Sequence, residues 1–245
     1  MRSLIVLARL LDYPTRELQQ AATEMHSVIA DEDHLSHPQR VALYGWIRRI
    51  ASSDLLDLQA DYVALFDKGR STSLLLFEHV HGESRDRGQA MVDLLDQYRQ
   101  AGFELSAREL PDYLPVFLEY LSTRDETDIA RQLSDIAHIL GLVAARLRER
   151  ESDYALVPTA LLAMLGADTA IEEHAEAVKK EARDDTPAAL DAVWEEEAVR
   201  FNATSDEDCA LQSATGRRRA ELKHQTQADV PIRIIPPTVN AAPGH

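Results

Sequence analysis

Cysteine is scarce in this chain of 245 residues, and basic residues are fewer than acidic ones. A single cysteine, Cys209, excludes a framework of intramolecular disulfides and is typical of a protein from a reducing compartment. Only 26 lysines and arginines stand against 42 acidic residues, which gives a formal net charge of −16 at pH 7. Because this charge repels phosphate backbones, we expect no nucleic-acid partner, and a basic peptide is the more natural ligand.

Long apolar runs are also missing. No stretch reaches the roughly 18 uninterrupted apolar residues that a membrane-spanning helix needs, so we expect a soluble protein with no membrane insertion. The apolar run from Leu4 to Leu11 is short and is interrupted by Arg9. Asp12, Tyr13 and Pro14 follow it in place of the small residues of a signal-peptide cleavage site. The run is therefore interpreted as a first buried helix.

The sequence lacks the short motifs of common enzymes. It has no Gly-x-Ser-x-Gly nucleophile elbow, no phosphate-binding loop and no dinucleotide fingerprint. We therefore predict no catalytic residues and no enzyme activity. An enzyme that uses a metal held by histidines and carboxylates stays as an alternative.

What the chain does contain is a helical pattern of apolar residues, which make up 45% of the sequence. Apolar positions recur three and four residues apart, and no run alternates as a half-buried strand does. The fold class that we predict is all-α, a single globular helical bundle with an acidic C-terminal segment and a flexible tail. Helices are expected over residues 4–11, from Pro14 to about 29, from Pro38 past 50, from Asp54 to 66, over 89–98, from Asp125 to about 150, and over 157–165.

The chain divides by composition near residue 166. Residues 167–208 contain fourteen acidic and four basic residues, a local balance of −10. A segment of this charge folds poorly alone, although apolar anchors recur in residues 188–201. We therefore expect a core over 1–166, an acidic helical segment over 167–201 that docks on the core, and a flexible tail over 202–245.

The tail gives a first testable prediction. It lacks the periodicity of a core element and carries the polar cluster Arg217, Arg218 and Arg219 and a proline-bearing end. Ending the chain after Phe201 is therefore expected to leave partner binding intact. A truncated protein that keeps its thermal stability but no longer binds would show that the tail is needed.

The stretch from Ser73 to Gly88 has the most unusual composition in the chain. It joins an apolar run, residues 74–77, to closely spaced groups of both charge signs. Gly82 and Gly88 allow backbone angles that other residues resist, so we expect turns at both positions. Asp86 is then a candidate cap for the helix at 89–98.

Three interpretations of this stretch stay open. Glu78, His79, His81 and Glu83 include the ligand types of a zinc or iron site, but no further histidine or cysteine follows at a recognised interval, so we predict no metal. An ion-paired loop that braces two helices is the second interpretation. The third is a recognition loop for a partner.

Recognition and bracing predict different effects of mutation. A groove that receives a peptide stays partly open to water, where ion pairs add little to stability. We expect recognition, under which replacing His81 and Arg87 by alanine weakens partner binding with a small loss of stability. Under bracing, the same change lowers the stability by about 3–5 kcal/mol.

A second unusual segment runs from Glu109 to Leu121. Pro111 and Pro115 lie four residues apart near a predicted helix start, where they fix the backbone and remove two amide donors. The segment is either a kinked helix entry or a second wall of the same partner site. The candidate partner-binding residues are Leu76, Phe77, Glu78, His79, His81, Glu83, Arg85, Asp86, Arg87, Glu109, Pro111, Asp112, Tyr113, Pro115 and Glu119.

These segments resemble a known family. The Leu-Asp-Tyr-Pro start at 11–14, residues 62–67, 73–88 and 109–115, and the run 194–201 are similar to the assembly chaperones of membrane-bound respiratory nitrate reductase, the NarJ or delta-subunit type. This type lies within the wider TorD-like family of molybdoenzyme chaperones. The resemblance covers roughly residues 4–201, and Phe-Glu-His-Val-His-Gly-Glu-Ser-Arg-Asp-Arg-Gly at 77–88 is its most specific part.

The resemblance implies a cytoplasmic, all-helical chaperone that is absent from the finished enzyme. Such a chaperone binds the immature catalytic (alpha) subunit of respiratory nitrate reductase, including its N-terminal peptide that looks like a relic twin-arginine leader. It delays membrane docking and permits insertion of the molybdenum cofactor, with which it has at most transient contact through the client. A different molybdoenzyme client is the alternative.

The chain departs from the wider family at one position. That family often carries a Glu-Pro-x-Asp-His type motif, whereas this chain has Tyr113 where the histidine is expected. We therefore expect no role for a titrating imidazole at this position.

Overall fold

The computed structural model describes residues 1–81, 85–105, 109–192 and 194–195. Residues 1–190 form one compact unit, and the chain from Asp191 onward forms a second unit. The described helices are α1 (Arg2–Leu11), α2 (Arg16–Gln20), α3 (Ala22–Ala30), α4 (His37–Ser52), α5 (Leu55–Phe66), α6 (Glu78–His81), α7 (Arg85–Gln100), α8 (Leu114–Ser122), α9 (Glu126–Asp135), α10 (Ala137–Glu149), the 3-10 helix η1 (Asp153–Ala155), α11 (Leu156–Met164) and α12 (Thr169–Val178). Among these residues there is no strand, and the all-α prediction is confirmed.

Several predicted helix ends are confirmed by their capping interactions. The Asp54 carboxylate accepts a hydrogen bond from the Leu56 amide at 2.8 Å and so caps α5. Asp125 caps α9 in the same way, with the Asp128 amide as donor at 2.9 Å. Gly102 and Gly166 follow α7 and α11 with φ of 74° and 65°, the left-handed conformation that glycine adopts most easily.

Two predicted helices are each divided in the structure. The helix expected from Pro14 to residue 29 is two helices that meet at Ala21, and the helix expected from Asp125 to 150 is broken at Ile136. At Ile136 the backbone leaves the helical region, with φ −105° and ψ 5°. The apolar pattern continues across the break because both halves bury one face in the same core. Neither break carries a glycine or proline that could have predicted it.

The expected turn at Gly88 and the Asp86 cap were also wrong. Helix α7 begins at Arg85, so Asp86 lies in its first turn and Gly88 lies inside the helix. A carboxylate in the first turn is favourable to the helix dipole, and one glycine in a helix costs only about 1 kcal/mol. Residues 82–84 and 106–108 lie outside the described residues, and so does the predicted turn at Gly82. The expected tail likewise lies outside them.

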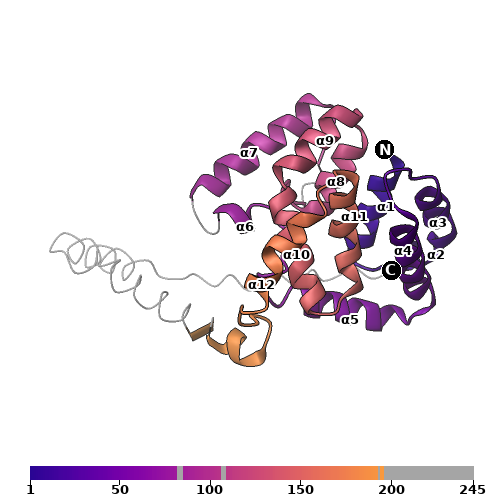
Figure 1. The fold of residues 1–245 in the computed structure, drawn as a ribbon. Coiled ribbons are helices and arrows are strands. Elements are labelled where there is room, and N and C mark those ends of the chain that lie inside the picture. Colours follow the sequence, from indigo (N-terminus) through magenta and orange to yellow (C-terminus); the bar gives the residue numbers. More distant parts are fainter. Residues whose placement is uncertain (82–84, 106–108, 193, 196–245) are drawn as a thin grey trace, which may run out of the picture. The chain divides into compact units, whose positions relative to one another are not determined.

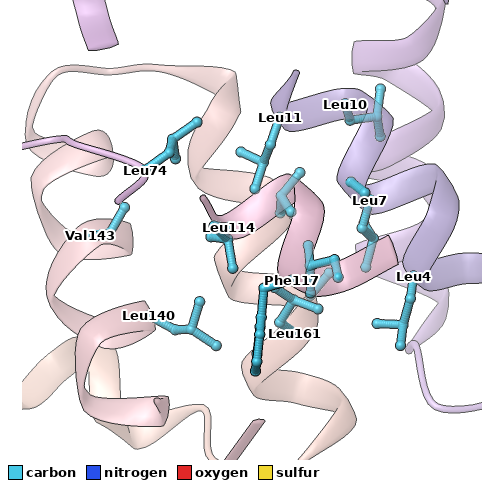
Figure 2. Packing of buried hydrophobic residues seen from close by; sticks show 14 of the residues in the cluster. Leu4, Leu7, Leu10, Leu11, Leu74, Leu114, Phe117, Leu140, Val143 and Leu161 are labelled. Atoms are coloured by element: carbon cyan, nitrogen blue, oxygen red, sulfur yellow. The ribbon is translucent and has the colours of Figure 1, made fainter. Parts of the chain in front are cut away.

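The core lies where α1 packs on α8 and on the helices around it (Figure 1). In Figure 2, Leu7 and Leu11 of α1 lie beside α8, while Leu140 and Val143 of α10 lie on its other side. Leu4, Leu7 and Leu11 are wholly buried. Leu74 is also part of this core and lies between Val143 and Leu114, so the core anchors one end of the stretch at 73–88 (Figure 2).

Helix α12, from the acidic segment, packs closely on α10. A Cβ atom placed on Gly141 of α10 would lie 2.6 Å from the carbonyl oxygen of Ala170 in α12. Only glycine fits at so short an approach. No helix in the described part of the chain is long and apolar enough to cross a membrane.

Candidate functional site

The two unusual segments of the sequence lie side by side in the structure. Leu75 and Tyr113 form an isolated antiparallel bridge. The Leu76 amide donates to the Asp112 carbonyl at 2.9 Å, and the Leu114 amide donates to the Leu74 carbonyl at 2.8 Å. This paired segment, residues 74–76 with 112–114, brings together two stretches that are far apart in the sequence.

Asp112 is the most deeply buried charged residue of this region. Its side chain is fully inaccessible, and its Oδ2 accepts a hydrogen bond from the Phe77 amide at 3.2 Å. Its Oδ1 has no hydrogen-bond partner among the described residues. Burial raises the pKa of Asp112 above its ordinary value, against the opposing effects of the Phe77 amide and the nearby Arg87.

Arg87 links α7 to both of its acidic neighbours. Its guanidinium lies 3.2 Å from Glu78 Oε1 and 3.7 Å from Asp112 Oδ2. The Arg87 side chain is 21% exposed and that of Glu78 is 25% exposed, so water screens these pairs only in part. For Arg87 this geometry favours the bracing interpretation, and the expected small stability loss on its replacement no longer follows.

His79 is held by the backbone that precedes it. Its Nε2 donates to the Ser73 carbonyl at 2.9 Å. Burial lowers the pKa of His79 below its ordinary value, so the ring is neutral at pH 7. Among the described residues, no three histidine, cysteine or carboxylate side chains gather as a metal-ion site.

Several other candidate residues serve the core. Leu76, Pro111 and Pro115 are buried, and Phe77 packs against the core while partly buried. The Pro111 carbonyl accepts a hydrogen bond from the buried Tyr98 hydroxyl at 2.7 Å. In this conformation these side chains pack in or against the core and support the paired segment, and they are not presented to a partner.

The exposed candidates are fewer. Asp86 and Glu109 are exposed, and Glu119 is half-buried. The side chains of His81, Glu83 and Arg85 lie outside what the structure describes. The predicted partner-binding set is therefore a mixture of supporting residues and surface carboxylates.

Tyr113 replaces the expected histidine with a neutral hydroxyl. The Tyr113 oxygen lies 3.0 Å from the Tyr62 hydroxyl and 3.3 Å from Asp12 Oδ1, to which it donates. The Tyr62 hydroxyl donates in turn to the Leu11 carbonyl at 3.1 Å. Burial raises the pKa of both phenols, so neither ionises near neutral pH. Tyr113 thus fixes the end of α1 against the paired segment.

This geometry predicts a structural role for Tyr113. We expect Tyr113→Phe to lower the free energy of unfolding by about 1 kcal/mol, because one buried hydrogen-bonding group is lost while the ring stays in place. Any loss of affinity for a partner should accompany this loss of stability, because Tyr113 acts only by holding Asp12. Urea unfolding and a binding titration of the same variant measure the two effects, and a loss of affinity without a loss of stability would contradict the structural role.

Glu119 connects the paired segment to a groove that was not predicted from the sequence. Its Oε1 lies 2.8 Å from the Arg9 guanidinium, which also lies 3.4 Å from Asp12. Arg9 and Asp12 line a cavity of about 460 Å³ between α1 and the α2–α3 pair. We call this cavity the α1 groove. Its lining residues are Arg2, Ile5, Val6, Arg9, Asp12, Tyr13, Thr15, Glu17, Leu18, Ala21, Glu24, Met25 and Val28.

The α1 groove is lined by both apolar and charged residues. Ile5 and Tyr13 are 44% and 43% exposed, although both are large apolar residues. Met25 can adapt its shape to a bound side chain. The sequence did contain one signal for this groove. Ile5 is an apolar residue that shares a face of α1 with Arg2 and Arg9, and this face does not pack in the core. The arrangement suits the apolar side of a short amphipathic helix.

Comparison with known proteins gives a family and named relatives. The family model described as "Nitrate reductase delta subunit" matches residues 13–157. The nitrate reductase molybdenum cofactor assembly chaperone NarJ of Escherichia coli (strain K12) is 52% identical over 221 residues, which cover 89% of this chain and 92% of that protein.

Two further relatives extend the range of similarity. The probable nitrate reductase molybdenum cofactor assembly chaperone NarW of the same strain is 42% identical, over 86% of this chain and 90% of its own length. The probable nitrate reductase molybdenum cofactor assembly chaperone NarJ of Bacillus subtilis (strain 168) is 32% identical, over 65% of this chain and 85% of its own length. Because the family model spans more than half of the sequence, the chain belongs to the nitrate reductase delta subunit family.

Proposed function

We propose that this protein is a chaperone for the assembly of nitrate reductase, and that it acts at insertion of the molybdenum cofactor. The observation that carries the proposal is 52% identity, over 89% of the chain, to a relative named as a nitrate reductase molybdenum cofactor assembly chaperone. The all-α fold and the motifs at 73–88 and 109–115 agree with the resemblance on which the same function was predicted.

The client in this proposal is the immature catalytic subunit, including its N-terminal peptide. An amphipathic helix of such a peptide can place its apolar face on Ile5 and Met25 in the α1 groove. The exposed Glu17 and Glu24 in the groove lining, together with the net charge of −16, attract basic residues of the peptide and speed its encounter.

The paired segment contributes indirectly in this mechanism. Tyr113 and Glu119 hold Asp12 and Arg9, which line the α1 groove. Asp86 and Glu109 are exposed carboxylates from the two joined segments and are candidates for contact with basic residues of the client. The protein performs no catalysis in this proposal. It acts in the cytoplasm and meets the molybdenum cofactor only transiently, through the client.

A test of the function follows cofactor insertion in cells. The nitrate reductase subunits are produced in cells without this protein, with it, or with a variant whose α1 groove is altered. We expect the catalytic subunit to accumulate without molybdenum when the protein is absent, and expect the wild-type protein to restore molybdenum content and nitrate reduction. A catalytic subunit that reaches full molybdenum content in its absence would refute the proposal.

The identity of the client has a separate test. Affinity purification of this protein from cells that make nitrate reductase should recover the catalytic subunit. Recovery of a different molybdoenzyme in its place would assign the chaperone to that enzyme.

A further inference from the structure

The acidic segment after α12 is joined to the loop before the paired segment by a dense set of charged contacts. Asp184 Oδ2 accepts a hydrogen bond from the Ser71 amide at 2.7 Å, and its Oδ1 accepts one from the Ser71 hydroxyl at 2.6 Å. The Arg150 guanidinium also donates to Asp184 Oδ1, at 3.2 Å. We call this set, Ser71, Arg146, Arg150, Glu181 and Asp184, the acidic clasp.

Two arginines near the C-terminal end of α10 complete the acidic clasp. Arg146 binds both carboxylate oxygens of Glu181, at 2.8 and 2.9 Å, and donates to the Ser71 carbonyl at 2.9 Å. Arg150 donates to the Ser71 hydroxyl at 2.8 Å. The amide, the carbonyl and the hydroxyl of Ser71 are therefore all bonded to charged groups. Such bonds are about twice as strong as neutral ones.

Burial and packing set these contacts apart from ordinary surface ion pairs. The Arg150 side chain is 9% exposed and that of Arg146 is 16% exposed, so water screens their charges weakly. A Cβ atom placed on Gly69 would lie 2.6 Å from Asp184 Oδ1. Glycine at position 69 therefore lets the Asp184 carboxylate approach the loop backbone.

The acidic clasp is only two residues away from the candidate site. Ser73 follows Ser71 and Thr72 in the chain. Its carbonyl accepts a hydrogen bond from the His79 ring, and its hydroxyl accepts one from the Leu75 amide at 3.2 Å. Leu74 and Leu76 then pair with residues 112–114. A loop fixed at Ser71 thus sets where the paired segment begins, whereas a loose loop would let it shift.

We propose that Asp184 is a positioning residue, which fixes the loop 69–73 and thereby keeps residues 74–76 in register with 112–114, where Tyr113 holds Asp12 at the α1 groove. The client part of this inference rests on the proposed function. The physical part does not, because it concerns only the order of one loop. The acidic segment then has a defined task in the chaperone, in addition to its contribution to net charge.

The test uses full-length protein with Asp184→Ala, and hydrogen exchange followed by mass spectrometry. We expect amide exchange in residues 69–77 to rise about tenfold or more, since the Ser71 and Leu76 amides lose their fixed geometry. Exchange in α1 should stay unchanged and serves as the internal reference for global folding. Affinity for the N-terminal peptide of the catalytic subunit should fall by about fivefold, a difference of roughly 1 kcal/mol.

Two further variants sharpen the test. Glu176→Gln removes an acidic group from the same segment and should change neither readout, since among the described residues Glu176 pairs only with the exposed Lys179. Gly69→Ala should reproduce the effect of Asp184→Ala, because the added methyl group displaces the carboxylate. The double variant should be no worse than Asp184→Ala alone, since both changes remove one contact.

The outcomes separate the two claims. Unchanged exchange at 69–77 in Asp184→Ala would overturn the role of the acidic clasp in fixing the loop. Faster exchange with unchanged peptide affinity would overturn its positioning role for the client. If wild-type protein does not bind the peptide at all, the proposed mode of client recognition fails. Hydrogen exchange at residues 69–77 then still tests whether the acidic clasp fixes the loop.

Discussion

Arg87→Ala is expected to lower the free energy of unfolding by about 3 kcal/mol, the lower end of the cost of breaking a buried ion pair. The substitution leaves the fully buried Asp112 carboxylate without the guanidinium 3.7 Å away, and leaves Glu78 without its partner at 3.2 Å. For a protein of this length the melting temperature should fall by about 6–12 °C. Thermal unfolding followed by circular dichroism measures the change.

The same variant should show a characteristic pH dependence. Burial already raises the pKa of Asp112, and the loss of Arg87 would raise it further above the unfolded value of about 3.9. A carboxyl with a raised folded pKa destabilises the protein as the pH rises through that range, because it must ionise while buried. The deficit of Arg87→Ala should therefore be largest near neutral pH and should shrink as the pH falls toward about 4.

Two control variants for this prediction change another arginine of α7 and the buried partner of Arg87. Arg99, also in α7, is 65% exposed and pairs with the exposed Asp96, so Arg99→Ala should change stability by less than about 0.5 kcal/mol. Adding Asp112→Asn to Arg87→Ala should recover part of the loss, because the uncompensated charge disappears. An Arg87→Ala protein as stable as wild type would show that Arg87 does not brace the paired segment.

Ile5→Glu is expected to reduce affinity for the N-terminal peptide of the catalytic subunit by about 100-fold, or nearly 3 kcal/mol. Ile5 lines the α1 groove, and a bound apolar helix face would enclose the new carboxylate without a partner. Ile5 is 44% exposed in the free protein, so the carboxylate can stay hydrated there and stability should change little. Peptide titration and thermal unfolding of the same preparation give both quantities.

A matched control separates the groove from general charge effects. Leu56 in α5 is an apolar residue that is 74% exposed and does not line the α1 groove. Leu56→Glu adds the same charge and should leave peptide affinity within about twofold of wild type, since one distant surface charge is largely screened by salt. Equal losses in the two variants would indicate a nonspecific effect, and no loss in Ile5→Glu would place the peptide elsewhere.

Local sequence signals were sufficient for most of the helices. Asp54 and Asp125 identify helix starts because their carboxylates satisfy free amides, and Gly102 and Gly166 identify ends because they adopt positive φ. These are effects within one turn of the chain. The break at Ile136 could not be predicted, since it arises where two helices bury the same kind of apolar stripe and the sequence itself carries no breaker.

The candidate site depended more on contacts between distant segments. Composition indicated that Glu78, Arg87 and Asp112 matter, but the burial of Asp112 follows from pairing between residues 74–76 and 112–114, which are 36 to 40 positions apart in the sequence. The α1 groove was not predicted, because its lining comes from three helices and each of them has an ordinary helical pattern of apolar residues. The acidic segment was expected to dock, whereas the specific bonds of Asp184 to Ser71 required the three-dimensional structure.

The most direct test of chaperone function compares two forms of the catalytic subunit of nitrate reductase as ligands for the purified full-length protein. One form is produced without the molybdenum cofactor and the other is fully loaded. We predict saturable binding to the cofactor-free form, at least about tenfold tighter than to the loaded form, because a chaperone must release its client once the cofactor is in place. Equal affinity for the two forms, or no binding to the cofactor-free form, would contradict a role in cofactor insertion.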